Sequence, residues 1–454
     1  MDEILEYRDN SLEEHLYDLW LAVTLGATSR YYDVLLQRYA SAFEVFRADT
    51  EELEELGIPE RILKRMREMD RTALDEYAGK CSDRRIGVIV RGCKGYPERL
   101  RSIRNAPYLL FFKGRLPDFD RLICTAVVGP RKMSEYGMNM AYKIGYELSA
   151  AGAVVVSGMA RGVDACAAAG AMEAGGVTVA VTGRGLDGVY PPEHETLMEK
   201  ICEKGAVLSE YGLGEPPMAS HFPQRNRIVS GLCQGTLVVE AGQKSGAMLT
   251  ANDALIQGRH VYAVPGNVGS PTSAGSNDLI KAGATVVLRA SDVIRNYRLL
   301  YGDTIDAERL KQAELNSDLR PGILQKYGVW TAGTASVTRR SAPAAQNGEG
   351  KHFAAEYGDK EKSTTGHDTA DPETVRRPDE TRKPGKTEPE TSPDRIPEGI
   401  MREVYMAMEP GKLVTADHLT QLGYSVGDAV TALSMLNVMG FVDEAHGGAY
   451  VRHS

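Results

Sequence analysis

The sequence predicts an α/β fold: an extended Rossmann-like, doubly wound parallel sheet, with a small helical domain before it and a winged-helix domain after it. Three observations lead to this prediction. Short, almost continuously apolar runs alternate with helical runs between residues 79 and 300, which is typical of a parallel sheet covered by helices on both faces. Apolar residues at helical spacing dominate residues 1–78. A polar segment separates the central region from a last apolar stretch at residues 396–454.

Residues 1–78 are expected to form a module of short helices. Leu19 and Trp20 belong to a set of apolar residues that recur at helical spacing. The run Leu56-Gly57-Ile58-Pro59 is typical of the tight turn in a SAM-like or helix-hairpin-helix-like module. Such modules contact DNA or protein, and the glutamates between residues 51 and 55 beside this turn favour the protein-interaction interpretation.

The central domain is assigned to residues 79–300. Its strands are expected at Ile86 to Val90, Tyr108 to Phe112, Leu122 to Val128, Val154 to Val156, Val177 to Val181, Ala206 to Leu208, Thr236 to Val239, His260 to Val264 and Ala284 to Leu288. The first two strands are expected to extend one edge of the sheet. The main helices are expected at Tyr136 to Ala151, Asp164 to Ala174, Glu193 to Glu203 and Thr250 to Gln257.

Residues 301–395 are expected to be a mostly disordered linker, because large apolar residues nearly vanish from about Thr331 onward. In residues 396–454, three helical runs precede two short strands, which is the order of a winged helix. A winged helix normally reads duplex DNA with its third helix. Here a protein-contact role is favoured, because that helix has no Lys or Arg and exposes Asp428, Thr431, Ser434 and Asn437.

Composition limits the function classes. The net charge of −9 and the pI of about 5.6 exclude a chain that coats nucleic acid by bulk basicity, so any DNA affinity must be local. The N-terminus lacks the pattern of a signal peptide, and no apolar run approaches the roughly 20 residues that span a bilayer, so a cytoplasmic protein without a membrane partner is expected. The six cysteines lie far apart without zinc-site spacing. They are interpreted as reduced and mostly buried, and neither a metal nor a cofactor is expected.

The loops that follow the strands carry the candidate binding residues. Ligands of an open parallel sheet bind beyond the carboxyl ends of its strands, near the point where the strand order reverses. Glycines let the backbone approach a phosphate, amide groups at the start of the next helix point at it, and arginines add paired donors. The first two loops supply Gly129, Arg131, Lys132, Ser157, Gly158, Arg161 and Gly162.

A third segment, from Phe222 to Arg227, combines two arginines with an aromatic ring, which are the ingredients of single-strand recognition. The alternative for both arginines is an ion pair with Glu210 or Glu240 at a neighbouring strand end. A fourth loop ends at a helix start and offers hydroxyl groups from Ser245 and Thr250, as ligands or as caps. These segments add Phe222, Arg225, Asn226, Arg227, Ser245 and Gly246 to the predicted contacts.

These blocks resemble the DprA/Smf family of DNA-processing proteins. The resemblance covers roughly residues 80 to 290 in register, and it is specific because several ordered blocks agree. The blocks are Ser157-Gly158-x-Ala160-Arg161-Gly162-x-Asp164, Gly185-Leu186-Asp187 followed by Tyr190-Pro191, Ser209-Glu210-Tyr211, Phe222-Pro223-x-Arg225-Asn226-Arg227, Ser245-Gly246 with Leu249-Thr250-Ala251, and Val264-Pro265-Gly266 leading to Asn277.

The resemblance implies a homodimer that binds and protects incoming single-stranded DNA. It implies that the protein loads the RecA recombinase onto this DNA in natural transformation and recombination, with single-strand-binding protein as a further partner. It implies no catalytic turnover. Carried over by position, the DNA contacts would be Arg131, Arg161, Phe222, Arg225, Asn226 and Arg227.

Three positions depart from the family pattern. Pro130 stands where Ser or Thr is usual, so a hydroxyl and an amide donor are lost. Ala219 stands in place of a common lysine, and Ala168 in place of an expected histidine. These departures predict weaker DNA affinity unless another cation, such as Lys132, compensates.

Two enzymatic alternatives deserve weighing. A glycine run from Gly183 to Gly188 follows a strand, as in a dinucleotide site, but Tyr190-Pro191-Pro192 stops a helix from starting there. Gly235-Thr236 with Glu240 faintly echoes nucleotide-processing hydrolases of the lysine-decarboxylase-like group, although the leading Pro-Gly-Gly of their signature is missing. The isolated histidines are interpreted as structural, so no catalytic residue is predicted; they are His194, His221 and His260.

Overall fold

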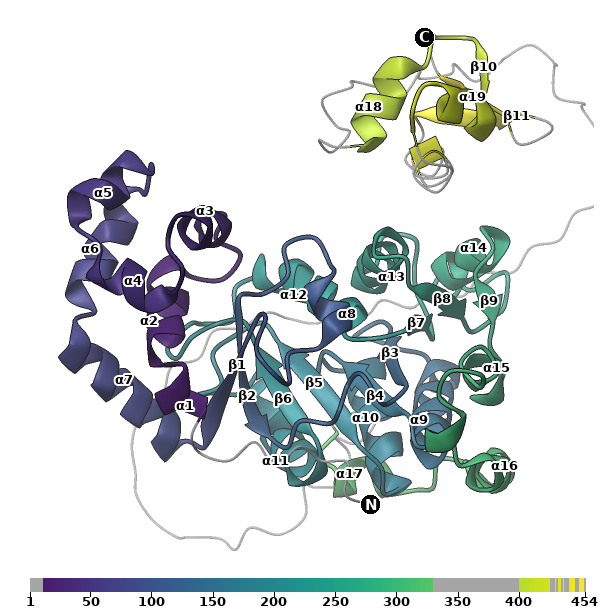
Figure 1. Cartoon of the computed structure of the whole chain (residues 1–454). Coiled ribbons are helices and arrows are strands. Elements are labelled where there is room, and N and C mark those ends of the chain that lie inside the picture. Colours follow the sequence, from purple (N-terminus) through teal and green to yellow (C-terminus); the bar gives the residue numbers. More distant parts are fainter. Residues whose placement is uncertain are drawn as a thin grey trace, which may run out of the picture. The chain divides into compact units, whose positions relative to one another are not determined.

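The computed structural model describes residues 11–329, 400–424, 429, 432–433, 436, 441–445 and 449–452. The chain divides into two compact units, residues 1–340 and residues 341–454. Figure 1 labels the elements of both units. Most of the segment predicted to be a linker lies outside the described residues.

Short helices form the start of the first unit, as predicted. They are α1 (Ser11–Glu14), α2 (Leu16–Leu25), α3 (Tyr31–Arg38), α4 (Ala42–Arg47), α5 (Thr50–Glu55), α6 (Glu60–Glu68) and α7 (Arg71–Asp83). Trp20 is buried, and its indole donates a hydrogen bond to the Met69 carbonyl at 2.9 Å. Gly57 takes a left-handed φ of +74° between α5 and α6, which confirms the tight turn. Its SAM-like or helix-hairpin-helix-like type stays a prediction.

All nine predicted strands occur in one sheet of the first unit. They are β1 (Ile86–Val90), β2 (Leu109–Gly114), β3 (Cys124–Val128), β4 (Val154–Ser157), β5 (Thr178–Thr182), β6 (Ala206–Ser209), β7 (Gly235–Val238), β8 (His260–Ala263) and β9 (Thr285–Val286). The strand order is β1-β2-β6-β5-β4-β3-β7-β8-β9. Strands β3 to β9 pair in parallel, whereas β1 and β2 pair antiparallel at one edge, as the predicted extension.

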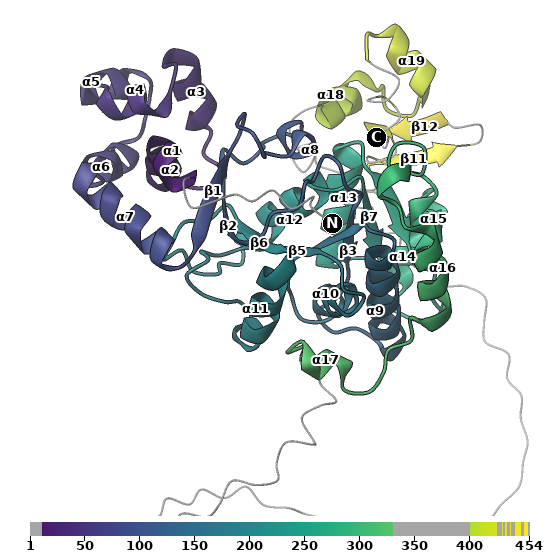
Figure 2. The same cartoon turned by 60° about the horizontal axis from the view of Figure 1, so that its bottom comes forward.

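Helices cover both faces of the sheet, so the fold is the predicted doubly wound, Rossmann-like one (Figure 2). On one face lie α9 (Glu135–Ala150), α10 (Val163–Glu173) and α11 (Glu195–Lys204); on the other lie α8 (Glu98–Arg101), α12 (His221–Gly231) and α13 (Gly246–Ile256). Successive strand residues supply the two core layers. Val155 packs in the layer of α9 and α10, while Val154 and Val156 pack in the layer of α12 and α13.

The direction of the winding reverses at β3, which lies between β4 and β7. The chain builds β4, β5 and β6 on one side of β3, then crosses to build β7, β8 and β9 on the other side. The loops that leave β3 and β7 therefore diverge to opposite faces, and a crevice is expected between them.

The folded core extends beyond residue 300, which corrects the predicted start of the linker. Residues 302–326 contain η2 (Gly302–Thr304), α16 (Ala307–Asn316) and α17 (Ile323–Lys326), preceded along the chain by α14 (Ala274–Lys281) and α15 (Ser291–Ile294). Leu310, Leu324 and Val329 are buried in the core. The composition of this stretch is polar, but its few apolar residues fall at the contact positions, which composition alone does not reveal.

The second unit contains α18 (Ile400–Ala407), β10 (Leu413–Thr415), α19 (Ala416–Gln421), β11 (Val442–Ala445) and β12 (Ala449–Arg452). The strands form a sheet in the order β10-β12-β11. Leu433 and Leu436 are helical and pack with Val404 and Leu419. This order fits a winged helix, which stays a prediction. The predicted exposed positions of its third helix, Asp428, Thr431, Ser434 and Asn437, lie outside the described residues.

Within the described part of the chain, no helix is both long and apolar enough to cross a membrane. The same residues hold no cluster of His, Cys, Asp and Glu that could bind a metal ion. All six cysteines are free thiols, and four of them are buried, as expected: Cys81, Cys124, Cys166 and Cys233.

Candidate functional site

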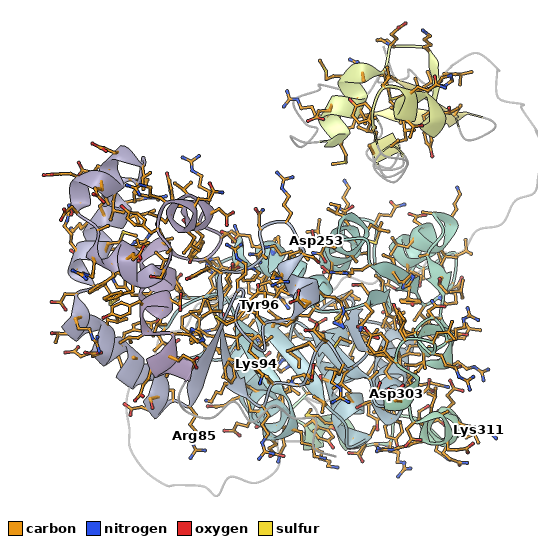
Figure 3. The ribbon with its side chains drawn as sticks, in the orientation of Figure 1. Arg85, Lys94, Tyr96, Asp253, Asp303 and Lys311 are labelled. Atoms are coloured by element: carbon orange, nitrogen blue, oxygen red, sulfur yellow. The ribbon has the colours of Figure 1, made fainter. Side chains whose placement is uncertain are left out.

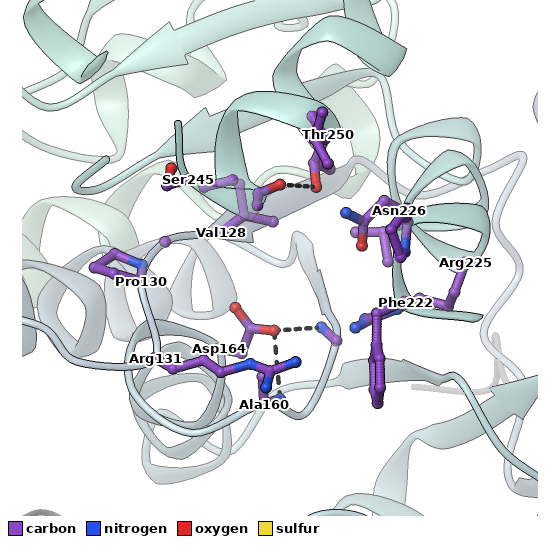
Figure 4. Close-up of a pocket in the computed structure, with 17 residues that line it drawn as sticks. Val128, Pro130, Arg131, Ala160, Asp164, Phe222, Arg225, Asn226, Ser245 and Thr250 are labelled. Atoms are coloured by element: carbon purple, nitrogen blue, oxygen red, sulfur yellow. Dashed lines mark hydrogen bonds between the residues drawn. The ribbon is translucent and has the colours of Figure 1, made fainter. Parts of the chain in front are cut away.

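A pocket of about 370 Å³ lies at the carboxyl ends of β3, β4 and β7, where the strand order reverses (Figure 4). The loop after β3, the loop after β4, α12 and the start of α13 each contribute to its walls. From the predicted contacts it gathers Gly129, Arg131, Gly158, Phe222, Arg225, Asn226, Ser245 and Gly246. Sequence reasoning therefore located the pocket, although not every predicted residue lines it.

The loops after β3 and β4 pack directly against each other. A Cβ at Gly129 would lie 2.5 Å from the Val163 side chain. Gly162 has a φ of +82°, and a Cβ there would lie 2.2 Å from the Pro130 carbonyl oxygen. That oxygen accepts a hydrogen bond from the Val163 amide at 3.4 Å. Gly162 is therefore needed for the close approach of the two loops, and it does not line the pocket.

Asp164 holds the loop after β4 in shape. Its carboxylate accepts hydrogen bonds from the amides of Gly158 at 3.1 Å and Ala160 at 3.4 Å. Burial raises the pKa of Asp164, and the nearby Arg225 charge opposes that rise. Asp164 therefore fixes the loop that precedes its own helix. Ser157 is also structural, because its buried hydroxyl donates to the Val127 carbonyl at 2.8 Å.

Arg225 is the buried cation of the pocket. It is only 5% exposed, and its Nη1 donates to the Val181 carbonyl at 2.9 Å. Its Nε is buried without a partner, and no ion pair to Arg225 occurs in the described residues. A Cβ at Gly158 would lie 1.7 Å from Nη1, so only glycine leaves room for the guanidinium. Burial lowers the pKa of Arg225, while the charge of Asp164 opposes that shift. The predicted alternative of a pair with Glu210 or Glu240 does not apply to Arg225.

Arg227 does not line the pocket, unlike the other arginine of its segment, and its predicted DNA contact stays a prediction. Its Nη2 donates to both carboxylate oxygens of Glu210, at 2.8 and 2.9 Å. The side chains of this pair are 13% and 4% exposed. Residues two apart on a helix point about 200° apart, so Arg225 and Arg227 could not both face one ligand. The ion-pair alternative is correct for Arg227.

Two further arginines lie at the rim. The exposed Arg131 guanidinium stands 5.2 Å from the centre of the Phe222 ring, and the Tyr190 ring lies 5.3 Å from Phe222. Arg161 borders a small adjoining hollow beside Tyr190 and Phe222, but it forms an ion pair with Glu193. Its hydrogen bond lowers the pKa of Glu193. Lys132 is exposed and lines neither hollow.

The start of α13 closes the pocket. Ser245 precedes the helix, and Gly246 and Ala247 form its first turn, whose amide groups lack partners within the helix. The Ser245 hydroxyl is buried without a partner. The Thr250 hydroxyl donates weakly to the Gly246 carbonyl at 3.5 Å, so it neither caps nor reaches a second side chain. Helix starts of this kind attract anions.

Sequence reasoning missed the apolar wall of the pocket. Val128, Val229, Ala247 and Leu249 line it, but their sequence signal is that of ordinary core residues. Only their position, at the end of β3, in the last turn of α12 or in the first turn of α13, could have separated them from the core.

The enzymatic alternatives find no support in this geometry. Glu240 lies outside the pocket lining, where it accepts a hydrogen bond from the Ser134 amide at 3.0 Å. After the glycine run the chain forms only η1 (Pro192–His194) before α11, so no helix starts at those glycines. His194 and His221 bind the main-chain carbonyls of Met159 and Gly183, as expected of structural histidines.

The fold and the pocket define a class of protein: a Rossmann-like protein with a pocket at the reversal point of its sheet, lined by glycine loops, a helix start and a buried arginine, which is a lining suited to an anion. The family model described as DNA recombination-mediator protein A matches residues 87–298. DNA processing protein DprA of Streptococcus pneumoniae is 43% identical over 204 residues, which cover 44% of this chain and 71% of that protein. Protein Smf of Escherichia coli is 34% identical over 280 residues, which cover 62% of this chain and 74% of that protein.

The chain therefore belongs to the DprA/Smf family, as the sequence motifs predicted. The X-ray structure of DNA processing protein A from Streptococcus pneumoniae aligns with a TM-score of 0.54 and 32% identity. The alignment covers 62% of this chain and 97% of that one. It supports the Rossmann-like core independently of the strand assignments.

Proposed function

We propose that this protein binds single-stranded DNA in the strand-end pocket and acts in DNA recombination during natural transformation. The observation that carries the proposal is Arg225, a cation that is 5% exposed, beside Gly158 and in no direct ion pair with any of the described residues. Burying an unpaired charge costs several kcal/mol. The Asp164 carboxylate offsets part of this charge from the same pocket without forming an ion pair. A phosphate in the pocket would add a counter-charge in direct contact with the guanidinium, with amides at the start of α13 as further donors.

Single-stranded DNA suits the rim better than duplex DNA. The Phe222 ring, next to Arg131 and Tyr190, offers an aromatic surface, and stacking of a base on such a ring contributes about 1–3 kcal/mol. A duplex keeps its base faces stacked on one another and cannot use this surface. The net charge of −9 confines the attraction to this site, so binding depends on local contacts.

The remaining parts of the proposal rest on membership of the family. We propose that the protein is a cytoplasmic homodimer that protects incoming DNA, loads a RecA recombinase onto it and contacts single-strand-binding protein. We propose that it binds without catalysing a reaction. In support, the pocket hydroxyls of Ser245 and Thr250 have no histidine or carboxylate partner in the described residues.

The test is a mobility-shift comparison of single- and double-stranded oligonucleotides of one sequence, over a series of salt concentrations, with the full chain. The proposal expects preference for the single strand and an affinity that falls with salt. It also expects no free base after incubation with nucleoside monophosphates. Absence of DNA binding, or equal binding of the duplex, would refute it.

A further inference from the structure

The connection between β6 and α12 joins the strand-end pocket to the N-terminal helical module, which consists of α1 to α7. This connection, residues 210–220, contains no helix or strand. The helix that follows it supplies three pocket residues, Phe222, Arg225 and Asn226. Its N-cap residue, Ser220, makes no side-chain hydrogen bond to the first turn. The first turn of α12 therefore depends on contacts from other residues for its position.

Tyr211 supplies those contacts. It is 4% exposed, and its ring stacks on the His221 ring with 3.9 Å between the ring centres. Its hydroxyl donates to the His221 carbonyl at 3.3 Å and to Oε1 of Gln224 at 3.2 Å. Phe222 directly follows His221 in the helix. A shift of Tyr211 would therefore move Phe222 at the rim of the pocket.

The helical module contacts the chain on both sides of Tyr211. Before it, the Glu210 carboxylate accepts a hydrogen bond from the Thr28 amide at 3.4 Å. After it, the Leu213 amide donates to the Tyr77 hydroxyl of α7 at 2.6 Å. Figure 1 shows α7 beside β1, at the antiparallel edge of the sheet. The module therefore fixes the chain immediately before and after the residue that holds α12.

The connection has little space to move at these contacts. Gly212 is buried, and a Cβ there would lie 2.7 Å from the Tyr77 hydroxyl oxygen. A Cβ at Gly185, in the loop after β5, would lie 2.2 Å from the Gly212 carbonyl oxygen. The connection is thus in close contact with both α7 and the loop after β5, so a displacement of α7 would displace it as well.

We propose that the helical module sets the DNA affinity of the strand-end pocket by positioning α12, with Tyr77 and Glu210 as the positioning residues. Neither side chain lines the pocket. Tyr77 acts through Tyr211 and the first turn of α12. Glu210 acts through its ion pair with Arg227 of the same helix, at 2.8 Å. This role rests on the proposed function and extends it to a part of the chain that does not touch the DNA.

Loss of the Tyr77 hydroxyl should reduce the fraction of molecules in which α12 is correctly placed. The Leu213 amide loses its partner, and the connection is free to take other positions. The apparent affinity falls in proportion to the fraction of molecules that can bind. One hydrogen bond of ordinary strength changes such an equilibrium by about three- to tenfold.

The experiment measures the affinity of the full chain for an oligothymidylate by fluorescence anisotropy, at several salt concentrations. Tyr77→Phe is expected to weaken binding by about three- to tenfold. Its salt dependence should equal that of the wild type, because no phosphate contact is lost. Tyr39→Phe is the matched control, since that hydroxyl donates to Glu52 within the module at 3.0 Å; it should leave the affinity unchanged. Urea unfolding shows that each variant is folded under the binding conditions.

A second pair of variants tests the contact from the other side. In Gly212→Ala, the new methyl group would lie 2.7 Å from the Tyr77 hydroxyl oxygen and must displace the connection. This variant is expected to weaken binding at least as much as Tyr77→Phe does. In the double variant Gly212→Ala/Tyr77→Phe that oxygen is absent, so the double variant should bind the oligothymidylate more tightly than Gly212→Ala alone.

The outcomes separate the two proposals. If the wild type does not bind the oligothymidylate, the proposed function fails. The positioning role is refuted, while DNA binding stands, if Tyr77→Phe binds as tightly as the wild type or if Tyr39→Phe weakens binding equally. It is also refuted if the double variant binds no more tightly than Gly212→Ala. A weaker salt dependence of Tyr77→Phe would contradict it too, because that result would indicate a lost phosphate contact.

Discussion

Replacing Arg131 with alanine is expected to reduce the salt dependence of single-stranded DNA binding by the equivalent of one phosphate contact. Arg131 is exposed, and its guanidinium lies 5.2 Å from the centre of the Phe222 ring. No ion pair engages it in the described residues, so its charge is available to a phosphate. Its exposure also means that the substitution leaves the core intact.

The size of the effect follows from the release of counterions. Each neutralised phosphate contributes about 0.7 to the slope of log K against log salt for a single strand, so the variant slope should be shallower by about 0.7. Between about 50 and about 200 mM salt, this difference changes the affinity ratio of wild type to variant by roughly 2.6-fold.

The assay is an anisotropy titration of a labelled oligothymidylate at several salt concentrations. Arg298→Ala is the matched control, because it removes the same charge from an exposed position outside the pocket. Its slope should equal that of the wild type. Equal slopes for the Arg131 and Arg298 variants would refute the phosphate contact of Arg131, whatever happens to the affinity itself.

Three other predictions concern stability and the second unit. Burial raises the pKa of Asp253 on α13 (Figure 3) from 3.8 to about 6, so the folded chain holds a proton that the unfolded chain releases, and the free energy of unfolding falls as the pH rises across that range. Asp253→Asn should flatten this part of the pH profile in urea unfolding; an unchanged profile would contradict the shift. Arg227→Ala leaves the buried Glu210 carboxylate without its ion-pair partner and should lower the free energy of unfolding by about 3–5 kcal/mol. The salt dependence of single-stranded DNA binding should not change. A weaker salt dependence together with a small loss of stability would instead indicate that Arg227 contacts DNA. Deletion of residues 396–454 should keep DNA affinity within about tenfold, or ~1.4 kcal/mol, and a larger loss in the same titration would assign DNA contacts to the second unit.

The sheet could be predicted from the sequence because each strand is an apolar run between glycine-rich turns. The position of the site could also be predicted from the sequence, because parallel strands bring their carboxyl ends to one edge of the sheet. The direction of each side chain could not be predicted. Arg225 and Arg227 have the same chemistry and lie two residues apart, yet one faces the pocket and the other pairs with Glu210. Only the placement of α12 against β5, with Glu210 beside its other face, decides between them.

The places of the three residues that depart from the family pattern could not be predicted from the sequence either. Pro130 was expected to weaken DNA affinity because it removes a hydroxyl and an amide donor, and this stays a prediction. In the structure its carbonyl oxygen accepts the Val163 amide, and the residue lines the pocket. Ala168 is buried in α10, and Ala219 is exposed before α12. Neither alanine lines the pocket. The sequence alone could not show that Ala168 and Ala219 lie outside the pocket walls whereas Pro130 is part of them.

The mutual packing of the two loops has a consequence for how such a site can change. Val163 fills the space that a side chain at Gly129 would need, and Pro130 fills the space beside Gly162. A side chain at position 129 therefore requires a smaller residue at position 163, whereas a side chain at position 162 would meet main-chain atoms of the other loop, which no substitution removes, so neither glycine tolerates a single replacement. For protein engineering, residues 128–134 and 157–164 form one cassette, which should be transplanted into another parallel sheet only as a pair.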